Sequence, residues 1–484
     1  MVESGMKEIR NYVGGRFVDH SSGDWIDVVE PATGRKFARA PLSNEADVES
    51  AVVAAREAQP GWGALGVEER AVWLDKIADS LESRFEEIAR LESRDTGKPI
   101  SLARSVDASR SVVNFRFFAE LLRESEEEKF ETEDSTNYVV YKPVGVGALI
   151  TPWNLPLYLL SWKVAPAIGM GNTVVCKPSE LTPMTADLLL RAIDEVGLPG
   201  GVVNLVHGDG VGAGAPLVGH DDVDLVSFTG GTATGSKVAS SAAPSFKKLS
   251  LELGGKNSSI VFADCDIEAT VEGVARAGFM NQGQVCLCGS RILVEASIYD
   301  EFRDRLVGAV EKLRMGDPSD ESTDLGSLIS PEHLQKVSDY VDLAIDEGGS
   351  ILTGGVSRAP DGFEGGSWMA PTVIEGVASD SRCATEEIFG PVVTLHRFET
   401  EDEAVSMANE TRYGLAGSVW TGDHERGRRV SQRIETGMTW VNTWLHRDLR
   451  VPFGGVKDSG VGREGGRWSL GFFSEPMNIC VKHD

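Results

Sequence analysis

The sequence is poor in cysteine, in positive charge and in long apolar runs. Six cysteines in 484 residues are too few for a disulfide scaffold, which predicts free thiols in a reducing compartment. The 47 basic residues are outnumbered by 74 acidic ones, and the net charge of -27 argues against nucleic acid or an anionic membrane as a partner. No run of 18 apolar residues occurs, and the N-terminus lacks the basic start and apolar segment of a signal peptide. We therefore expect a cytoplasmic protein.

The remaining composition is typical of a large globular protein. Hydrophobic residues make up 41% and charged residues 25%, which excludes a disordered or fibrous chain. At roughly 150 residues per domain, the length favours two or three domains. The 54 glycines exceed average usage and imply many tight turns or close backbone approaches.

Two hydrophobic patterns divide the first half of the chain. Apolar residues at helical spacing over 44–59 and 67–94 predict amphipathic helices, so the first quarter is expected to be helix-rich. After residue 144, β-branched runs alternate with helical stretches such as 185–196, which predicts a parallel sheet covered by helices. The predicted strands of this unit are 146–150, 173–176, 202–206 and 224–228.

A second series of elements follows Gly255. Residues 259–262 and 291–294 have the pattern of strands, and 267–280 and 299–313 have that of helices. This series indicates a second α/β unit.

Two further strand-like segments belong to neither unit. A polar run over 124–137, with acids at positions 126, 127 and 128, leads into the segment 138–141, and 477–482 lies near the end of the chain. Isolated strands of this kind are candidates for a hairpin that pairs with another subunit.

Cys286 is the candidate nucleophile among the cysteines. It lies between the end of a helical pattern and a strand, on a loop that a substrate can reach. Because a free thiol has a pKa of about 8.5, it needs a base or dipole nearby to act as a nucleophile. Cys286 and Cys288 stand two apart without a second pair or clustered histidines, so no metal site is predicted. The other cysteines are expected to be small buried hydrophobes, namely Cys176, Cys265, Cys383 and Cys480.

An acid and an amide are candidates for the remaining chemistry. Glu252 ends an apolar strand before two glycines, where burial would raise its pKa and make it a general base. The alternative is a solvated acid at a strand end. Asn154, between two prolines after the strand 146–150, could hold an oxyanion with its amide N–H. A turn asparagine is the alternative here.

Glycine-rich turns indicate a dinucleotide site. The segment 208–213 fits a loose G-x-G-x-x-A pattern, and the segment 228–235 is the stronger candidate because it leads from a strand into a helix. Lys177 and Glu180 follow another strand and could grip the two hydroxyls of a ribose. The Glu180 carboxylate would repel a 2′-phosphate and favour NAD over NADP. An ordinary solvated loop pair is the alternative for these two residues.

Together, these motifs resemble those of the NAD(P)-dependent aldehyde dehydrogenase superfamily over essentially the whole chain. The ordered set is Pro152-Trp-Asn-Leu-Pro156, Lys177-Pro-Ser-Glu180, Phe228-Thr-Gly230, Leu251-Glu-Leu-Gly-Gly255, Gln282-Gly-Gln-Val-Cys286, Glu387-Ile-Phe-Gly-Pro391 and Pro452-Phe-Gly-Gly455.

The resemblance implies an α/β fold with three parts. A Rossmann-like NAD-binding domain would comprise 1–123 and 143–253 with part of 450–470, and an α/β catalytic domain would comprise 254–449. A small β-hairpin oligomerisation element would comprise 124–142 and 471–484. Members of the family are homodimers or homotetramers.

The resemblance also implies a catalytic cycle. Cys286 would attack the aldehyde, and the Asn154 amide and the Cys286 backbone N–H would hold the oxyanion. After hydride transfer to NAD, Glu252 would activate water to hydrolyse the thioester. Relatives that transfer the acyl group to coenzyme A usually lack this acid, so its presence favours a free carboxylic acid as product.

The resemblance assigns cofactor contacts as well. Lys177 and Glu180 would bind the adenosine ribose, and Gly231 stands where a serine is frequent. The remaining contacts would be Gly230, Gly231 and Gly235 at the pyrophosphate, Glu387 and Phe389 at the nicotinamide riboside, and Trp153 in the cofactor cleft.

Within the superfamily, the sequence resembles the branch that oxidises 2-hydroxymuconic and 2-aminomuconic semialdehydes in aromatic catabolism. In that branch two tunnel arginines bind the substrate carboxylate, and they match Arg110 and Arg447. Leu155 and Trp162 are expected as apolar tunnel walls. The alternatives are a generalist or amino-aldehyde dehydrogenase, of the betaine aldehyde type, and a non-catalytic protein of the same fold.

Overall fold

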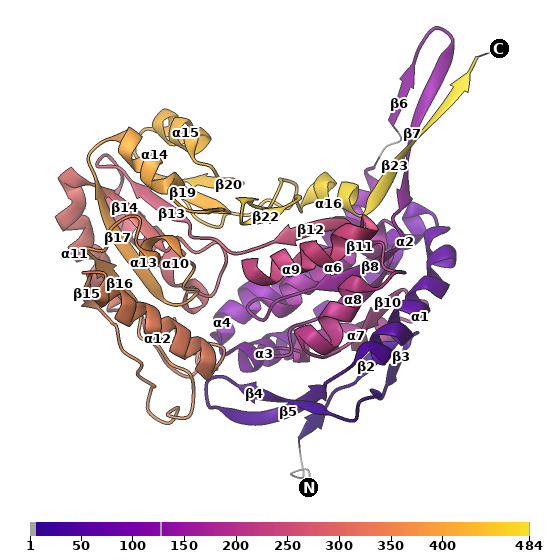
Figure 1. Cartoon of the computed structure of the whole chain (residues 1–484), viewed down its shortest axis with the longest axis horizontal. Coiled ribbons are helices and arrows are strands. Elements are labelled where there is room, and N and C mark those ends of the chain that lie inside the picture. Colours follow the sequence, from indigo (N-terminus) through magenta and orange to yellow (C-terminus); the bar gives the residue numbers. More distant parts are fainter. Residues whose placement is uncertain (1–5, 126–127, 484) are drawn as a thin grey trace.

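The structure is a computed structural model that describes residues 6–125 and 128–483 (Figure 1). Residues 1–5, at the start of the segment considered for a signal peptide, lie outside the described residues, as do the expected hairpin positions 126 and 127 and the final residue 484. In the part of the chain that is described, no helix is long and apolar enough to cross a membrane.

An eight-stranded sheet forms the larger half, in the order β22-β12-β11-β8-β9-β10-β2-β3. Its five central strands are parallel and confirm the predicted series. They are β8 (Val146–Ile150), β9 (Thr173–Lys177), β10 (Val203–Leu205), β11 (Leu225–Thr229) and β12 (Lys248–Glu252). Strands β8, β9 and β10 are buried at every position, because helices cover both faces of the sheet.

The register of this sheet brings the functional loops together. Ile150 at the end of β8 pairs with both Lys177 and Phe228, and Thr229 pairs with Glu252. The carboxyl ends of four parallel strands therefore meet at one edge, the place where open α/β sheets bind ligands.

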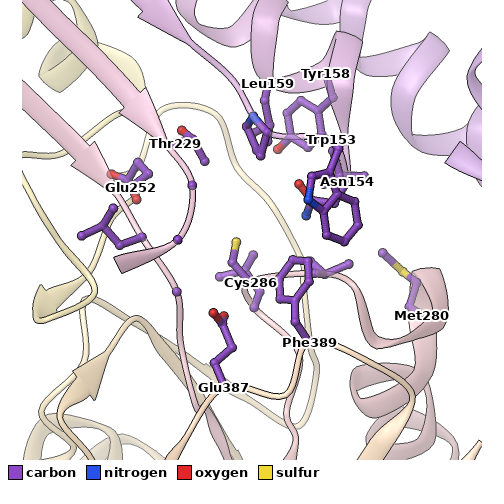
Figure 2. A pocket seen from close by; sticks show the side chains of 18 of the residues that line it. Trp153, Asn154, Tyr158, Leu159, Thr229, Glu252, Met280, Cys286, Glu387 and Phe389 are labelled. Carbon is purple, nitrogen blue, oxygen red and sulfur yellow. The ribbon is translucent and has the colours of Figure 1, made fainter. Parts of the chain in front are cut away.

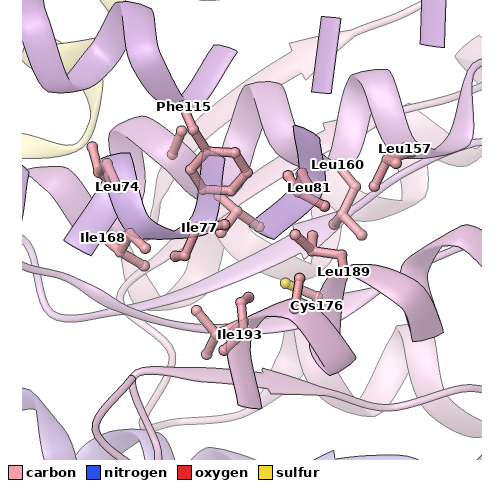
Figure 3. Packing of buried hydrophobic residues seen from close by; sticks show 14 of the residues in the cluster. Leu74, Ile77, Leu81, Phe115, Leu157, Leu160, Ile168, Cys176, Leu189 and Ile193 are labelled. Atoms are coloured by element: carbon pink, nitrogen blue, oxygen red, sulfur yellow. The ribbon is translucent and has the colours of Figure 1, made fainter. Parts of the chain in front are cut away.

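A helical layer supplies the core on one face of the sheet, and Figure 3 shows its packing. Leu74, Ile77 and Leu81 come from one amphipathic helix and Phe115 from another. The helices of this layer are α2 (Val67–Ser83), α3 (Phe85–Thr96), α5 (Ser109–Arg123), α6 (Pro156–Gly169) and α7 (Met184–Glu195). The helices α1 (Glu45–Gly63), α8 (Ala215–Gly219) and α9 (Thr232–Ala242) pack on the other face.

A seven-stranded sheet forms the second half, in the order β15-β16-β17-β14-β13-β19-β20, and confirms the second α/β unit. Its strands are β13 (Ser258–Val261), β14 (Arg291–Glu295), β15 (Ser350–Thr353), β16 (Thr372–Glu375), β17 (Val392–Phe398), β19 (Ala416–Trp420) and β20 (Met438–Val441). Its helices are α10 (Ile267–Phe279), α11 (Tyr299–Val310), α12 (Pro331–Asp346), α13 (Arg382–Thr385), α14 (Glu401–Asn409) and α15 (His424–Arg433).

Short elements lie between these longer helices and strands. They are α4 (Ile100–Leu102), the π-helical turn η1 (Ala103–Ala108), η2 (Gly210–Gly214), η3 (Ala243–Ser245), η4 (Met280–Gly283), η5 (Ala296–Ile298), β18 (Tyr413–Gly414), β21 (Val456–Lys457), β22 (Gly460–Val461) and α16 (Gly466–Phe472).

A three-stranded antiparallel sheet stands away from both halves (Figure 1). It consists of β6 (Glu128–Glu131), β7 (Ser135–Pro143) and β23 (Ser474–Lys482), so the two isolated strand-like segments do pair with each other. Its exposed apolar side chains are Phe130, Tyr141, Met477, Ile479 and Val481.

The structure corrects the sequence analysis at the start of the chain. The first quarter is helix-rich, but it begins with five short strands that hydrophobic periodicity missed. The single helix expected over 67–94 is broken at Arg84, whose φ of -106° is not helical. The five strands are β1 (Lys7–Glu8), β2 (Asn11–Val13), β3 (Arg16–Val18), β4 (Trp25–Glu30) and β5 (Arg35–Pro41).

All six cysteines are free thiols. Cys176 and Cys383 are buried as expected. The prediction of burial is wrong for Cys480 and overstated for Cys265, which is partly exposed. Cys480 is exposed because it lies on β23, in the sheet that stands apart from the core.

Candidate active site

A pocket of about 290 Å³ is lined by residues from both halves of the molecule. Asn154 and Tyr158 come from the larger sheet and the helix after it, and Cys286, Glu387 and Phe389 come from loops of the second unit. Figure 2 shows Glu252, Asn154, Glu387 and Cys286 around one open space. The fold therefore brings the three predicted catalytic side chains to a single pocket.

A strained turn presents Cys286 to the pocket. Asn281 and Gln282 have left-handed φ angles of 53° and 57°. Gly283 has a φ of 70°, and a Cβ there would lie 2.0 Å from the Gly390 carbonyl oxygen, so the turn requires glycine. The thiol is partly exposed, and burial, followed by the charges of Glu387 and Glu252, raises its pKa. Cys286 therefore needs a base to become a thiolate.

Cys288 has a different environment. It is buried, and its sulfur lies 4.0 Å from the Met280 carbonyl oxygen. Burial raises the pKa of Cys288 to about 12. The residue lies outside the pocket lining, so its thiol is packed into the core and is not presented to a substrate.

Hydrogen bonds fix Asn154 on both its side chain and its backbone. Its Nδ2 donates to the Gln284 carbonyl at 2.9 Å, and its own carbonyl accepts from Lys98 Nζ at 3.0 Å. The residue is buried and follows β8, as the sequence predicted. One amide N–H remains to be donated to an oxygen atom in the pocket.

Glu252 is the last residue of β12 and lines the pocket. Neither of its carboxylate oxygens has a hydrogen-bond partner among the described residues. Burial, and after it the neighbouring Glu464, raises the pKa of Glu252. Glu464 itself accepts a hydrogen bond from Lys163 Nζ at 2.7 Å. The result is a carboxyl group suited to proton transfer near neutral pH.

The predicted adenosine-ribose residues lie at the carboxyl end of β9, with Lys177 as its last residue and Glu180 three residues later. Lys177 is buried, and its Nζ donates to the Pro178 carbonyl at 2.9 Å and lies 3.5 Å from Glu180. Both residues lie outside the pocket lining, at the same sheet edge as Thr229 and Glu252.

Two of the three predicted phosphate glycines line the pocket. Gly230 and Gly231 connect β11 to α9, and Gly231 precedes the first residue of that helix. Gly235 lies one turn further, where a Cβ would come within 2.5 Å of Leu253, so it allows α9 to pack against that side chain. The weaker glycine pattern, 208–213, forms a turn after β10 capped by Asp209, outside the pocket lining.

Aromatic rings and Glu387 border the other end of the pocket. Trp153 makes edge contacts with Phe389 at 5.3 Å and with His333 at 5.2 Å between ring centroids. Glu387 is partly buried and accepts a hydrogen bond from the Gly255 N–H at 2.9 Å, and desolvation of its carboxylate raises its pKa. Sequence reasoning missed His333 and Lys336, which also line this pocket. A lone histidine and a lone lysine on a helix carry no local signal.

The two predicted clamp arginines both lie close to the ring of Trp162. The Cζ atoms of Arg110 and Arg447 are 5.8 Å and 5.4 Å from the Trp162 ring centroid. Burial lowers the pKa of Arg110, and the charge of Arg447 adds to this effect. Among the described residues, Nε and Nη2 of Arg110 and Nε of Arg447 are buried without a hydrogen-bond partner.

The structure places one of the two expected tunnel-wall residues in the pocket lining. Leu155 lines it, whereas Trp162 is buried behind it and contacts the arginines. Tyr158 and Phe453 line the pocket in its place, and each contacts one guanidinium group. In the described ranges, no group of three or more His, Cys, Asp or Glu could hold a metal ion.

The sequence profile described as "Aldehyde dehydrogenase family" matches residues 17–479. The chain belongs to the aldehyde dehydrogenase family. It is therefore an oxidoreductase that acts on aldehydes, and the family and fold expected from the motifs are confirmed.

Several relatives are similar to this dehydrogenase over nearly their whole length. The 2-aminomuconic semialdehyde dehydrogenase of Danio rerio is 49% identical, with 98% of each chain covered. The 2-hydroxymuconic semialdehyde dehydrogenase of Pseudomonas sp. (strain CF600) is 47% identical over 99% of this chain and 100% of the relative. The crystal structure of Staphylococcus aureus betaine aldehyde dehydrogenase in complex with NAD+ has a TM-score of 0.95 at 38% identity, covering 98% of this chain and 94% of that one.

Proposed function

We propose that this dehydrogenase oxidises 2-hydroxymuconic or 2-aminomuconic semialdehyde to the carboxylic acid with NAD as acceptor. The unpartnered guanidinium donors of Arg110 and Arg447 carry the proposal, because buried donors without a partner cost about 1–3 kcal/mol each unless a ligand satisfies them. A carboxylate at the far end of the substrate would accept from both side chains. The names of two similar relatives support the same substrate class.

The arrangement supports covalent catalysis at Cys286. The thiolate attacks the aldehyde carbon, and the Asn154 amide with the Cys286 backbone N–H donates to the oxygen that becomes negative. After oxidation the acyl group is bound to sulfur as a thioester. Glu252 then removes a proton from the attacking water, and the carboxylic acid is released.

The residues at the sheet edge fit NAD. Among the described residues, no atom lies within 4 Å of where a Cβ of Gly231 would be, so a phosphate can approach the backbone before α9. Lys177 and Glu180 would hold the adenosine ribose, and Glu387 with Phe389 and Trp153 would hold the nicotinamide riboside. When bound, NAD supplies the hydride acceptor.

Replacement of Arg447 tests whether the substrate carries a carboxylate that this arginine binds. We expect Arg447→Ala to raise the KM for a semialdehyde acid about 10- to 100-fold, the range for a lost hydrogen bond to a charged group, and to leave the KM for hexanal within about twofold. NADH formation at 340 nm measures both. Arg450→Ala is the control, because that arginine pairs with Asp448 at the surface. Equal effects on both aldehydes would refute the clamp.

The preference for NAD over NADP tests the proposed contact of Lys177 and Glu180 with the adenosine ribose. The Glu180 carboxylate is expected to repel the 2′-phosphate of NADP, so we expect NAD to be preferred. Glu180→Gln should raise kcat/KM for NADP about 5- to 10-fold, the size of one partly screened charge interaction. Glu195→Gln, an exposed acid at the end of α7, is the control. An unchanged ratio of NAD to NADP would show that Glu180 does not set the preference.

Betaine aldehyde is the second candidate substrate, because a structure named for that activity is similar to this chain. Arg110 and Arg447 argue against this substrate, because their charges would repel a quaternary ammonium group.

We also propose that the domain bounds expected from the sequence apply, that the projecting sheet joins a homodimer or homotetramer, and that the protein acts in the cytoplasm. Loss of all NADH formation across a panel of aldehydes would revive a non-catalytic role.

A further inference from the structure

A buried ionic cluster lies behind the wall of the active-site pocket. It consists of Glu92, Lys98 and Asp107, whose exposed fraction is 0% for each residue. No step of the proposed reaction uses these side chains. Charged groups without solvent are costly unless they are paired, so the cluster needs a physical explanation.

Lys98 joins two separate segments of the pocket wall. Its Nζ donates to Asp107 Oδ2 at 2.7 Å and to the Asn154 backbone carbonyl at 3.0 Å. Asp107 belongs to the π-helical turn η1, whose neighbouring residue Val106 lines the pocket. Three residues after Asp107 comes Arg110. One ammonium group therefore connects the turn that carries the amide to the segment that carries the carboxylate clamp.

Glu92 adds a third tie to the same turn. Its Oε1 accepts a hydrogen bond from the Leu157 N–H at 3.3 Å, at the start of α6. Burial, and after it the Asp107 carboxylate, raises the pKa of Glu92.

Stability alone does not account for an ion pair in this place. Apolar residues of similar volume often replace a buried ion pair with no loss of stability or with a gain. Lys98, in contrast, donates the shorter of two hydrogen bonds to the Asn154 carbonyl, at 3.0 Å, and Asn281 Nδ2 donates the other at 3.3 Å. A displacement of about 1 Å at a catalytic group can lower a rate about 100-fold.

We propose that Lys98 is a positioning residue, which holds the Asn154 amide in register with Cys286 and with the Arg110 segment through its bonds to the Asn154 carbonyl and Asp107. The inference rests on the proposed role of Asn154 in binding the oxyanion. Lys98 itself touches neither of the proposed reactants.

Three variants separate positioning from folding. Lys98→Met removes the tie, and Lys98→Met with Asp107→Leu also removes the charge left without a partner. Arg70→Met is the matched control, since Arg70 is a buried cation that donates to the Gly169 carbonyl at 2.7 Å, at the opposite end of α6. Melting temperature, kcat and the KM for NAD are measured on the full chain with hexanal.

We expect both Lys98 variants to lose kcat about 30- to 100-fold, with the KM for NAD unchanged within about twofold. The double variant should regain the melting temperature of the parent but not its kcat, and Arg70→Met should keep its kcat. A double variant that regains kcat would show that Lys98 acts only on stability and would overturn the proposal. Failure of both Lys98 variants to fold would also overturn it, because the cluster would then be a requirement of the fold.

A double-mutant cycle with Asn154→Ala identifies the route of the effect. If Lys98 acts through Asn154, Lys98→Met should lower kcat less than about threefold in the Asn154→Ala background. If Asn154→Ala alone lowers kcat and the two substitutions together lower it by the product of their separate factors, the positioning role is rejected and the proposed function is unaffected. An Asn154→Ala variant with unchanged kcat would instead reject the role of Asn154 in the proposed function, and the inference with it.

Discussion

Cys286→Ser is expected to lower NADH formation at least about 1,000-fold, the scale on which loss of a catalytic nucleophile acts. A serine hydroxyl in the same place is far less acidic than a thiol and adds poorly to the aldehyde carbon to form a hemiacetal, so the covalent step fails. Steady-state rates at saturating NAD and aldehyde measure the effect. Binding of NAD, measured by quenching of protein fluorescence, should persist, since Cys286 lines the part of the pocket where we propose that the aldehyde binds.

Cys288→Ser is the control for this variant. Its thiol is packed into the core beside Met280, outside the pocket lining, so we expect most of the activity to remain and only stability to fall. If Cys288→Ser were inactive and Cys286→Ser active, the nucleophile would be wrongly assigned.

Glu252→Gln is expected to lower steady-state turnover about 100- to 10,000-fold, the contribution of a general base. The amide keeps the shape of the side chain but cannot take a proton from water, so the acyl group should remain on Cys286. Single-turnover NADH formation should therefore fall less than the steady-state rate, and mass spectrometry should detect the acylated chain. Glu272→Gln, on the exposed side of α10, is the control. Equal loss in both phases would place the role of Glu252 before hydride transfer.

The raised pKa of Glu252 also fixes the direction of the pH dependence. Only the carboxylate can act as a base, and burial with Glu464 moves its formation to higher pH than for a free glutamate. Turnover limited by hydrolysis should thus rise with pH and fall as the pH drops through this raised pKa. In Glu252→Gln that limb of the profile should be absent.

Much of the site could be predicted because short motifs mark its loops. Asn154 and Glu252 lie at the ends of recognisable strand patterns, and the strand register brings those ends to one edge of the sheet. Cys286 follows a helical pattern of the second unit and lines the same pocket. His333 could not be predicted, because its contacts with Trp153 and Phe389 join segments that are distant in the sequence. The buried position of Lys98 could not be predicted either, since a lysine is usually solvent-exposed.

The fold was predictable where hydrophobic runs are long. The buried parallel strands are short, mostly apolar runs that contain β-branched residues and lack the helical spacing of an amphipathic helix. Strand β5 was missed because four of its seven residues are two arginines, a lysine and a proline, so apolar and polar residues do not alternate clearly along it. The break at Arg84 was missed because neither glycine nor proline marks it.

The pairing of β23 with β7 has a consequence for biosynthesis. All nine residues of β23 pair with β7, which lies roughly 330 residues earlier in the chain. At 5–20 residues per second, β7 leaves the ribosome about 20–70 s before its partner strand exists. During that interval its edge facing β23 has no internal partner, and an unpaired strand edge is a template for aggregation. This edge of β7 therefore stays open to pairing with other chains until β23 has been translated, and the three-stranded sheet can be completed only then.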